Sequence, residues 1–141
     1  MESRTLGRSG VEVCALGLGC MRLSADWQWI DGTKISFGAL GRETAVRCLR
    51  AAVDMGITLF DTSSIYGAGE NEETLGEAFA GIRDRVVIAT KFGNLADEAS
   101  RTILFVRDWE RQRGLTYRTD PYYIRWSCEQ SLRRLRTDYI D

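Results

Sequence analysis

The most regular pattern in the sequence is a run of apolar positions spaced three and four residues apart between residues 42 and 55. This spacing places the apolar side chains on one face of an α-helix. Gly56 follows, and glycine commonly ends a helix because it accepts a left-handed backbone. The pattern therefore predicts an amphipathic helix whose inner face is formed by Ala45, Val46, Leu49, Ala52 and Val53.

Two further helices are predicted, each with a marked beginning. One covers about 72–80, with Asn71 as its N-cap and Gly81 at its end. The other begins at Asp120-Pro121, an N-cap followed by proline at the first helical position. We expect the inward side chains to be Leu75, Ala78 and Phe79 in the former, and Ile124, Cys128, Leu132 and Leu135 in the latter.

Short apolar runs between these helices predict β-strands. Residues 5–6 and 11–13 flank Gly7-Arg8-Ser9-Gly10, which is typical of a hairpin. Residues 14–19 form an apolar run too short for a helix, and its glycines indicate close backbone approach. Further strands are predicted at 57–60 and 86–90, and 139–141 opens a fourth strand after the hairpin.

The order of elements is a hairpin, then strand and helix three times, then the beginning of a strand. Alternating strands and helices indicate an α/β fold with parallel strands and right-handed helical crossovers. The long connections, about 20–41, 62–70 and 92–119, all follow strands. Because α/β sheets and barrels carry their sites at the carboxyl ends of the strands, we expect a functional site there.

Composition narrows the function classes. Lys and Arg number 19 against 20 Asp and Glu, for a net charge of −1, which gives no broad attraction to nucleic acid or to an anionic membrane. The longest apolar run is far shorter than a membrane span. The four cysteines lack C-x-x-C spacing and the chain has no histidine, so we expect free thiols, a cytoplasmic location and no metal site.

Gly17-Leu18-Gly19-Cys20-Met21-Arg22 begins like the dinucleotide fingerprint of Rossmann domains. It departs from that fingerprint at the third glycine, where Arg22 stands. About twenty residues then separate it from the next helix, so no helix N-terminus follows to receive a pyrophosphate. The sequence therefore argues against a Rossmann site.

Three side chains capable of proton chemistry lie at or just past neighbouring strand ends: Asp61, Tyr66 and Lys91. A carboxylate beside Lys91 would keep its ammonium charged, and that charge would favour the Tyr66 phenolate, making Tyr66 a usable general acid. Each residue also has a structural interpretation. Asp61 with Thr62, Ser63 and Ser64 is typical of a hydrogen-bonded turn, Lys91 of a solvated strand end, and Tyr66 of a packed aromatic.

Taken in order along the chain, these segments resemble the aldo-keto reductases. The matching segments are Arg4–Val13, Leu16–Met21, Phe60–Thr62 with Tyr66-Gly67, Asn71-Glu72 with Leu75-Gly76, Val87–Gly93, and Ser131–Leu135 with Thr137–Asp141. They cover almost the whole chain, and their combination is more specific than any one of them.

The resemblance implies a (β/α)8 TIM barrel preceded by a β-hairpin, and NADPH-dependent reduction of an aldehyde or ketone to an alcohol. It implies Tyr66 as proton donor, with Lys91 and Asp61 tuning it. Gly19, Cys20, Met21 and Asp61 would lie at the cofactor. The fourth catalytic residue of the family, a histidine shortly after the Tyr-Ile-Asp motif, has no counterpart in this sequence.

A (β/α)8 barrel takes about 250 residues, so residues 1–141 correspond to the N-terminal half of the barrel. We therefore expect one partial barrel domain, inactive by itself as a fragment, that self-associates through its exposed sheet edges. The alternative is a non-catalytic half-barrel or a nucleotide-sensing binding subunit. Trp27, Trp29, Phe105 and Trp109 in the long connections would either wall an apolar pocket for the carbonyl substrate or pack within their loops.

Overall fold

Three parallel strands form the central sheet: β3 (Gly17–Gly19), β6 (Leu59–Asp61) and β7 (Val87–Ala89), in that spatial order. The computed structural model describes residues 2–23, 26–29, 33–35, 38, 40–93, 96–97, 102–103 and 118–141. Leu18, Phe60 and Ile88 share one row across the sheet, and this row faces the core. Because successive side chains of a strand point to opposite faces, the neighbouring row of Gly19, Asp61 and Ala89 faces away from the core.

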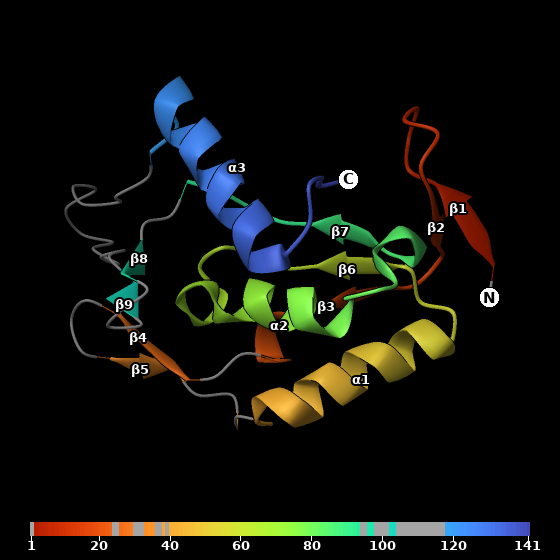
Figure 1. Ribbon diagram of the computed structural model, residues 1–141, viewed down its shortest axis with the longest axis horizontal. Coiled ribbons are helices and arrows are strands. Elements are labelled where there is room, and N and C mark those ends of the chain that lie inside the picture. The colour runs from red at the N-terminus through yellow and green to blue at the C-terminus, as the bar shows by residue number, and fades with distance from the viewer. Residues whose placement is uncertain are drawn as a thin grey trace.

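Three helices cover the core side of this sheet: α1 (Arg42–Asp54), α2 (Glu70–Ala78) and α3 (Pro121–Leu135). Helix α2 lies between the other two and contacts both (Figure 1). Phe60 of the sheet and Phe79 at the end of α2 pack with their ring centroids 4.7 Å apart. The core thus lies between a helical layer and one face of a parallel sheet, as the α/β class requires.

Two of the predicted helices have the expected termini. Helix α1 ends before Gly56, whose φ of 92° is left-handed, and its buried side chains are those of the predicted face, with Val46 partly buried. Asp120 caps α3 as predicted, because its carboxylate accepts a hydrogen bond from the backbone N–H of Tyr123. These local signals were sufficient because they depend only on neighbouring residues.

The predicted start of α2 is wrong, and of the predicted inner face of α3 only Leu135 is confirmed as buried. Helix α2 begins at Glu70 with Gly69 as its N-cap, so Asn71 lies in the first turn. In α3 the buried residues are Tyr123, Ser127, Ser131 and Leu135, while Ile124 and Cys128 are exposed and Leu132 is half-buried. Small side chains face α2 because the two backbones nearly touch: a Cβ at Gly76 would lie 2.5 Å from the Arg134 carbonyl oxygen.

The N-terminal hairpin is confirmed, with β1 (Ser3–Thr5) pairing antiparallel to β2 (Glu12–Cys14). Cys14 belongs to this hairpin, not to β3 as predicted. The predicted strand at 139–141 is not formed. Instead, the Asp141 carboxylate accepts the backbone N–H of Ile88 at 2.9 Å, so a side chain takes the place of strand pairing along β7.

The first and third long connections contain short strands that the sequence pattern did not predict. They are β4 (Trp27–Trp29), β5 (Lys34–Ile35), β8 (Ala96–Asp97) and β9 (Thr102–Ile103). Parallel pairing of β4 with β9 joins the two connections, and β4 and β8 lie beside the 3-10 turn η2 (Tyr66–Gly69). Strands of two or three residues carry no readable periodicity. The pairing that joins the two connections, β4 with β9, also spans about seventy residues of sequence.

Two further 3-10 turns are η1 (Met21–Leu23) and η3 (Arg83–Arg85).

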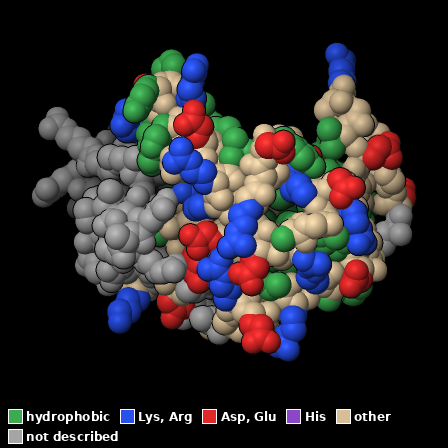
Figure 2. Space-filling view, viewed as in Figure 1, with side chains coloured by type: hydrophobic (Ala, Val, Ile, Leu, Met, Phe, Trp, Pro, Cys, Tyr) green, Lys and Arg blue, Asp and Glu red, His purple; other side chains and the backbone are tan. Residues whose placement is uncertain are grey.

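Acidic and basic side chains are interspersed over α1 and α2, whereas apolar side chains gather at the amino-terminal end of α3 (Figure 2), where Tyr122, Ile124 and Trp126 are exposed. Within the described ranges, no helix is both long and apolar enough to cross a membrane.

Candidate active site

The carboxyl ends of β6 and β7 bring Asp61 and Lys91 together. Asp61 lies in register with Ala89, and the N–H of Thr62 donates to the Ala89 carbonyl at 2.8 Å, so the parallel pairing continues past the strand ends. Lys91 follows two residues after Ala89. Because alternate residues of a strand share a face, the Lys91 and Asp61 side chains emerge on the side of the sheet away from the helices.

Lys91 is the centre of the predicted cluster. Its Nζ donates to Asp61 Oδ1 at 2.7 Å, to the Thr62 carbonyl at 2.8 Å and to Tyr66 Oη at 3.4 Å. The side chains of Lys91 and Asp61 are 45% and 47% exposed. Burial lowers the pKa of Lys91, but the bond to Asp61 and the charges of Tyr66 and Asp61 together outweigh it, so the pKa is raised and the ammonium is retained.

A tight turn carries Tyr66 to this ammonium. Gly67, Ala68 and Gly69 all have positive φ, at 61°, 51° and 97°, and all three are buried. Two glycines make this conformation accessible, since left-handed backbone is costly for other residues. The hydrogen-bonded turn considered as the structural alternative is also present, because Ser63 Oγ accepts the N–H of Ile65. Turn and cluster therefore coexist, and the turn places Tyr66.

The geometry determines where the Tyr66 proton can go. An ammonium has donors and no acceptor, so Lys91 donates to Tyr66 Oη and cannot receive the phenolic hydrogen. The phenolic hydrogen is therefore not used in the bond between Tyr66 and Lys91. A phenol with a charged donor on its oxygen is an arrangement suited to general acid catalysis.

Four buried or half-buried polar residues beneath the cluster were not predicted as part of the site: Thr62, Asn71, Glu72 and Thr90. Because the sequence pattern predicts Asn71 as a helix N-cap, its contacts with the strand ends were not expected. Its Nδ2 donates to the Cys20 carbonyl at 2.8 Å, and its Oδ1 accepts from Thr62 Oγ1. Glu72 accepts from Thr90 Oγ1 at 2.6 Å. Their presence in the segments that carry the resemblance was the available signal.

The residues predicted at the cofactor lie at the end of β3. Gly19 pairs in register with Asp61, and a Cβ there would meet nothing within 4 Å, so the space beside Asp61 is open. Met21 is exposed. Cys20 is fully buried, and burial together with the Asp61 charge raises the pKa of its thiol to about 12. Its side chain therefore stays protonated near neutral pH and lies under the site.

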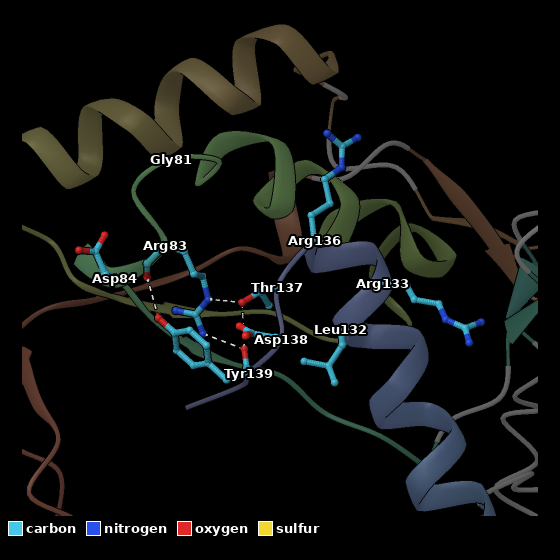
Figure 3. A pocket seen from close by; sticks show the side chains of 9 residues that line it. All are labelled: Gly81, Arg83, Asp84, Leu132, Arg133, Arg136, Thr137, Asp138 and Tyr139. Atoms are coloured by element: carbon cyan, nitrogen blue, oxygen red, sulfur yellow. Dashed lines mark hydrogen bonds between the residues drawn. The ribbon is translucent and has the colours of Figure 1, made fainter.

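Two hollows lined by described residues lie away from this cluster. One of about 770 Å³ lies at the amino ends of the strands, between the start of β7 and the end of α3 (Figure 3). Another of about 540 Å³ lies between the helices on the outer surface. Neither includes Asp61, Tyr66 or Lys91. The described segments hold no group of acidic or cysteine side chains arranged for a metal ion.

The structure describes only part of the predicted aromatic wall. Phe105 and Trp109 lie outside the described residues. Trp27 and Trp29 lie on β4, where their backbone takes part in the four-stranded sheet of the connections. The apolar pocket therefore stays a prediction.

Similar proteins agree on one family. The sequence model of the aldo/keto reductase family matches residues 15–141. An aldo-keto reductase from Bacillus halodurans, solved in its holo form, is 31% identical over all of this chain, with a TM-score of 0.75. One from Klebsiella pneumoniae, solved with NADPH, is 30% identical over all of the chain at a TM-score of 0.64. A glycerol dehydrogenase from Gluconobacter oxydans is 28% identical over 99%, at 0.70.

The chain spans 38%, 38% and 37% of the lengths of these three relatives. The superposition confirms the predicted fold, in which the hairpin is followed by the N-terminal portion of a (β/α)8 barrel. The family match covers the strand ends that carry Asp61 and Lys91 and the turn that carries Tyr66. The chain belongs to the aldo/keto reductase family.

Proposed function

We propose that this chain provides the proton-donating part of an NADPH-dependent reduction of an aldehyde or ketone to an alcohol. The observation that carries the proposal is the contact of Lys91 Nζ with both Asp61 and Tyr66 Oη. Tyr66 gives its proton to the carbonyl oxygen as negative charge builds there. The Lys91 ammonium stabilises the phenolate that remains, and Asp61 holds the ammonium in place.

The residues at the end of β3 suit a nicotinamide cofactor at this site. Gly19 leaves open space beside Asp61, and Met21 is exposed next to it, while Cys20 lies between them and joins β3 to β6 through its backbone N–H. We assign Gly19, Cys20, Met21 and Asp61 to the nicotinamide side. When bound, the cofactor would supply a hydride to the carbonyl carbon. NADPH is present in the Klebsiella pneumoniae relative.

Activity is best tested in a complete barrel. A chimera would join residues 1–141 to the part of the Bacillus halodurans relative that this chain does not match. That relative aligns with all of this chain. We expect the chimera to oxidise NADPH with a simple aldehyde. Tyr66→Phe should lower kcat by about 100-fold or more, the usual contribution of a general acid.

The matched control is Tyr122→Phe, since Tyr122 is 75% exposed on α3. It removes the same hydroxyl group without touching the site, so the rate should not change. A folded chimera that binds NADPH and keeps its full rate after Tyr66→Phe would contradict the assignment of Tyr66.

We infer that residues 1–141 alone do not complete the reaction, since the relatives are more than twice as long. The purified chain should oxidise NADPH no faster than its Tyr66→Phe variant. Aldehyde-dependent turnover that disappears in the variant would overturn this inference.

We also propose that the isolated chain self-associates. Among the described residues, β3 and β7 each pair with β6 alone in the parallel sheet, and Leu16 and Phe92 beside these edges are 63% and 49% exposed. Sheet edges with apolar neighbours and no adjoining strand favour pairing with a second copy. Light scattering should give a mass above that of one chain, and a monomer at all concentrations would exclude such pairing.

A further inference from the structure

The first turn of α2 buries two polar side chains completely. Asn71 and Glu72 both have an exposed fraction of zero. Burying an amide or a carboxylate is costly unless its polar atoms find partners. Both residues are hydrogen-bonded. Their partners are residues at the carboxyl ends of β3, β6 and β7 and, for Glu72, also Arg134 of α3.

Asn71 joins the ends of β3 and β6. Its Nδ2 donates to the Cys20 carbonyl at 2.8 Å, and its Oδ1 accepts from Thr62 Oγ1 at 2.5 Å. The carbonyl of Thr62 in turn accepts from Lys91 Nζ at 2.8 Å. Asn71 therefore holds, through one residue, an acceptor that fixes the ammonium.

Glu72 fixes the end of β7 in the same way. Its Oε1 accepts from Thr90 Oγ1 at 2.6 Å, and its Oε2 accepts from Arg134 Nε of α3 at 2.7 Å. Thr90 directly precedes Lys91. The strand end from which the lysine side chain projects is thus bonded to Glu72 of α2, and Glu72 is itself held by Arg134 of α3.

We propose that Asn71 and Glu72 are positioning residues, which hold the three strand ends so that Lys91 stays within reach of both Asp61 and Tyr66. This role rests on the proposed function of the cluster in proton transfer. The hydrogen bonds described above for Asn71 and Glu72 reach the cluster through Thr62 and Thr90. Packing alone does not require polar side chains here, because replacing a buried polar pair with apolar side chains is often neutral for stability. Directional bonds fix where the strand ends lie.

The chain is well suited to a direct test, because Lys34 and Lys91 are its two lysines. Nuclear magnetic resonance of the chain labelled with 15N-lysine would follow the Lys91 ammonium. The Lys34→Arg variant keeps only the Lys91 signal and so assigns it. Thr62→Val removes the hydroxyl that bonds Asn71 at nearly constant size, and Thr62→Ser keeps it. We expect ammonium proton exchange at Lys91 to become about tenfold faster in Thr62→Val, a change that corresponds to the net contribution of one hydrogen bond, and to stay near the original rate in Thr62→Ser.

Asn71→Leu and Thr90→Val test the two arms separately and should also speed exchange and lower the pKa of Lys91 from its raised value. Arg83→Met is the control, because it weakens contacts at the opposite end of the sheet. It should leave the Lys91 signal unchanged. If it moves Lys91 as much as Thr62→Val does, or if Thr62→Val and Thr90→Val move nothing, the positioning role is wrong.

These measurements need neither NADPH nor a substrate. A chimera that fails to reduce aldehydes would therefore count against the proposed function and leave the Lys91 result standing. Conversely, an active chimera with an unperturbed Lys91 in Thr62→Val would remove the positioning role alone.

Discussion

The two ends of the parallel sheet use charge in opposite ways. At the carboxyl end, Asp61 and Lys91 are nearly half exposed, and the fully buried side chains Asn71 and Glu72 hold the strands beneath them. The fold there holds the charged pair of Asp61 and Lys91 at a position open to solvent. The pair's own contribution to stability is small, because exposed ion pairs are well solvated.

At the amino end, the charged pair itself holds the structure. Arg83 and Asp141 are 16% and 17% exposed and lie 2.6 Å apart. Arg83 also donates to Thr137 Oγ1 and to the Tyr139 carbonyl (Figure 3), and to the Val86 carbonyl. Removing a side chain should therefore cost most where the polar group is buried and least where it is presented to solvent.

The largest expected loss follows from Arg134→Met, which leaves the buried Glu72 carboxylate without its ion-pair partner. An uncompensated buried charge costs about 3–5 kcal/mol of unfolding free energy. Arg133→Met makes the same change one residue away at an exposed position and should change stability little. Urea unfolding followed by circular dichroism compares the two, and equal losses would show that the buried pair is not special.

Gly76→Ala should cost about 3 kcal/mol, near the upper range for overpacking, because the new Cβ would lie 2.5 Å from the Arg134 carbonyl oxygen. Gly19→Ala, where a Cβ meets nothing within 4 Å, is the matched control with a small expected change. The same unfolding measurement applies. A stable Gly76→Ala chain would mean that α2 and α3 can separate without cost.

Arg83→Met should lower the unfolding free energy by roughly 2 kcal/mol, since it removes several hydrogen bonds from a charged donor. The substitution should also have a local effect. The backbone N–H of Ile88, which donates to Asp141, should exchange with deuterium faster. Arg85→Met, at an exposed position of the same turn, should not have this effect. Unchanged Ile88 protection in Arg83→Met would show that Asp141 does not depend on Arg83.

Lys91→Met should have the smallest effect, about 0.5 kcal/mol, as for other exposed ion pairs. The pKa of Lys91 is raised in the folded chain, so its contribution is complete below the ordinary lysine pKa near 10.5 and is lost as pH rises beyond it. Unfolding curves of the two chains should therefore converge at alkaline pH. A large loss at pH 7 would place this pair among the structural ones.

Much of the site could be predicted from the sequence, and the remainder has physical reasons. Asp61 and Lys91 follow apolar strands, and parallel strand ends meet at one edge, so their proximity was predictable. Asn71 was misread because a polar residue before an apolar run looks the same whether it caps a helix or reaches into the core.

The inner face of α3 was misread for a related reason. Ser127 and Ser131 are buried because α2 approaches closely at Gly76, and hydrophobic periodicity gives small polar residues no weight. The pairing of β4 with β9 joins residues such as Gln28 and Thr102. Their separation in the chain leaves no local pattern to find.

The carboxylate of Asp141 has a consequence for assembly. It occupies the backbone N–H of Ile88, which would otherwise serve as a template for another strand. Any polypeptide that adds to this edge must first displace an ion that Arg83 holds. Strand addition at β7 is thus a competition with an ion pair, and because this pair is largely buried, salt screens it only weakly.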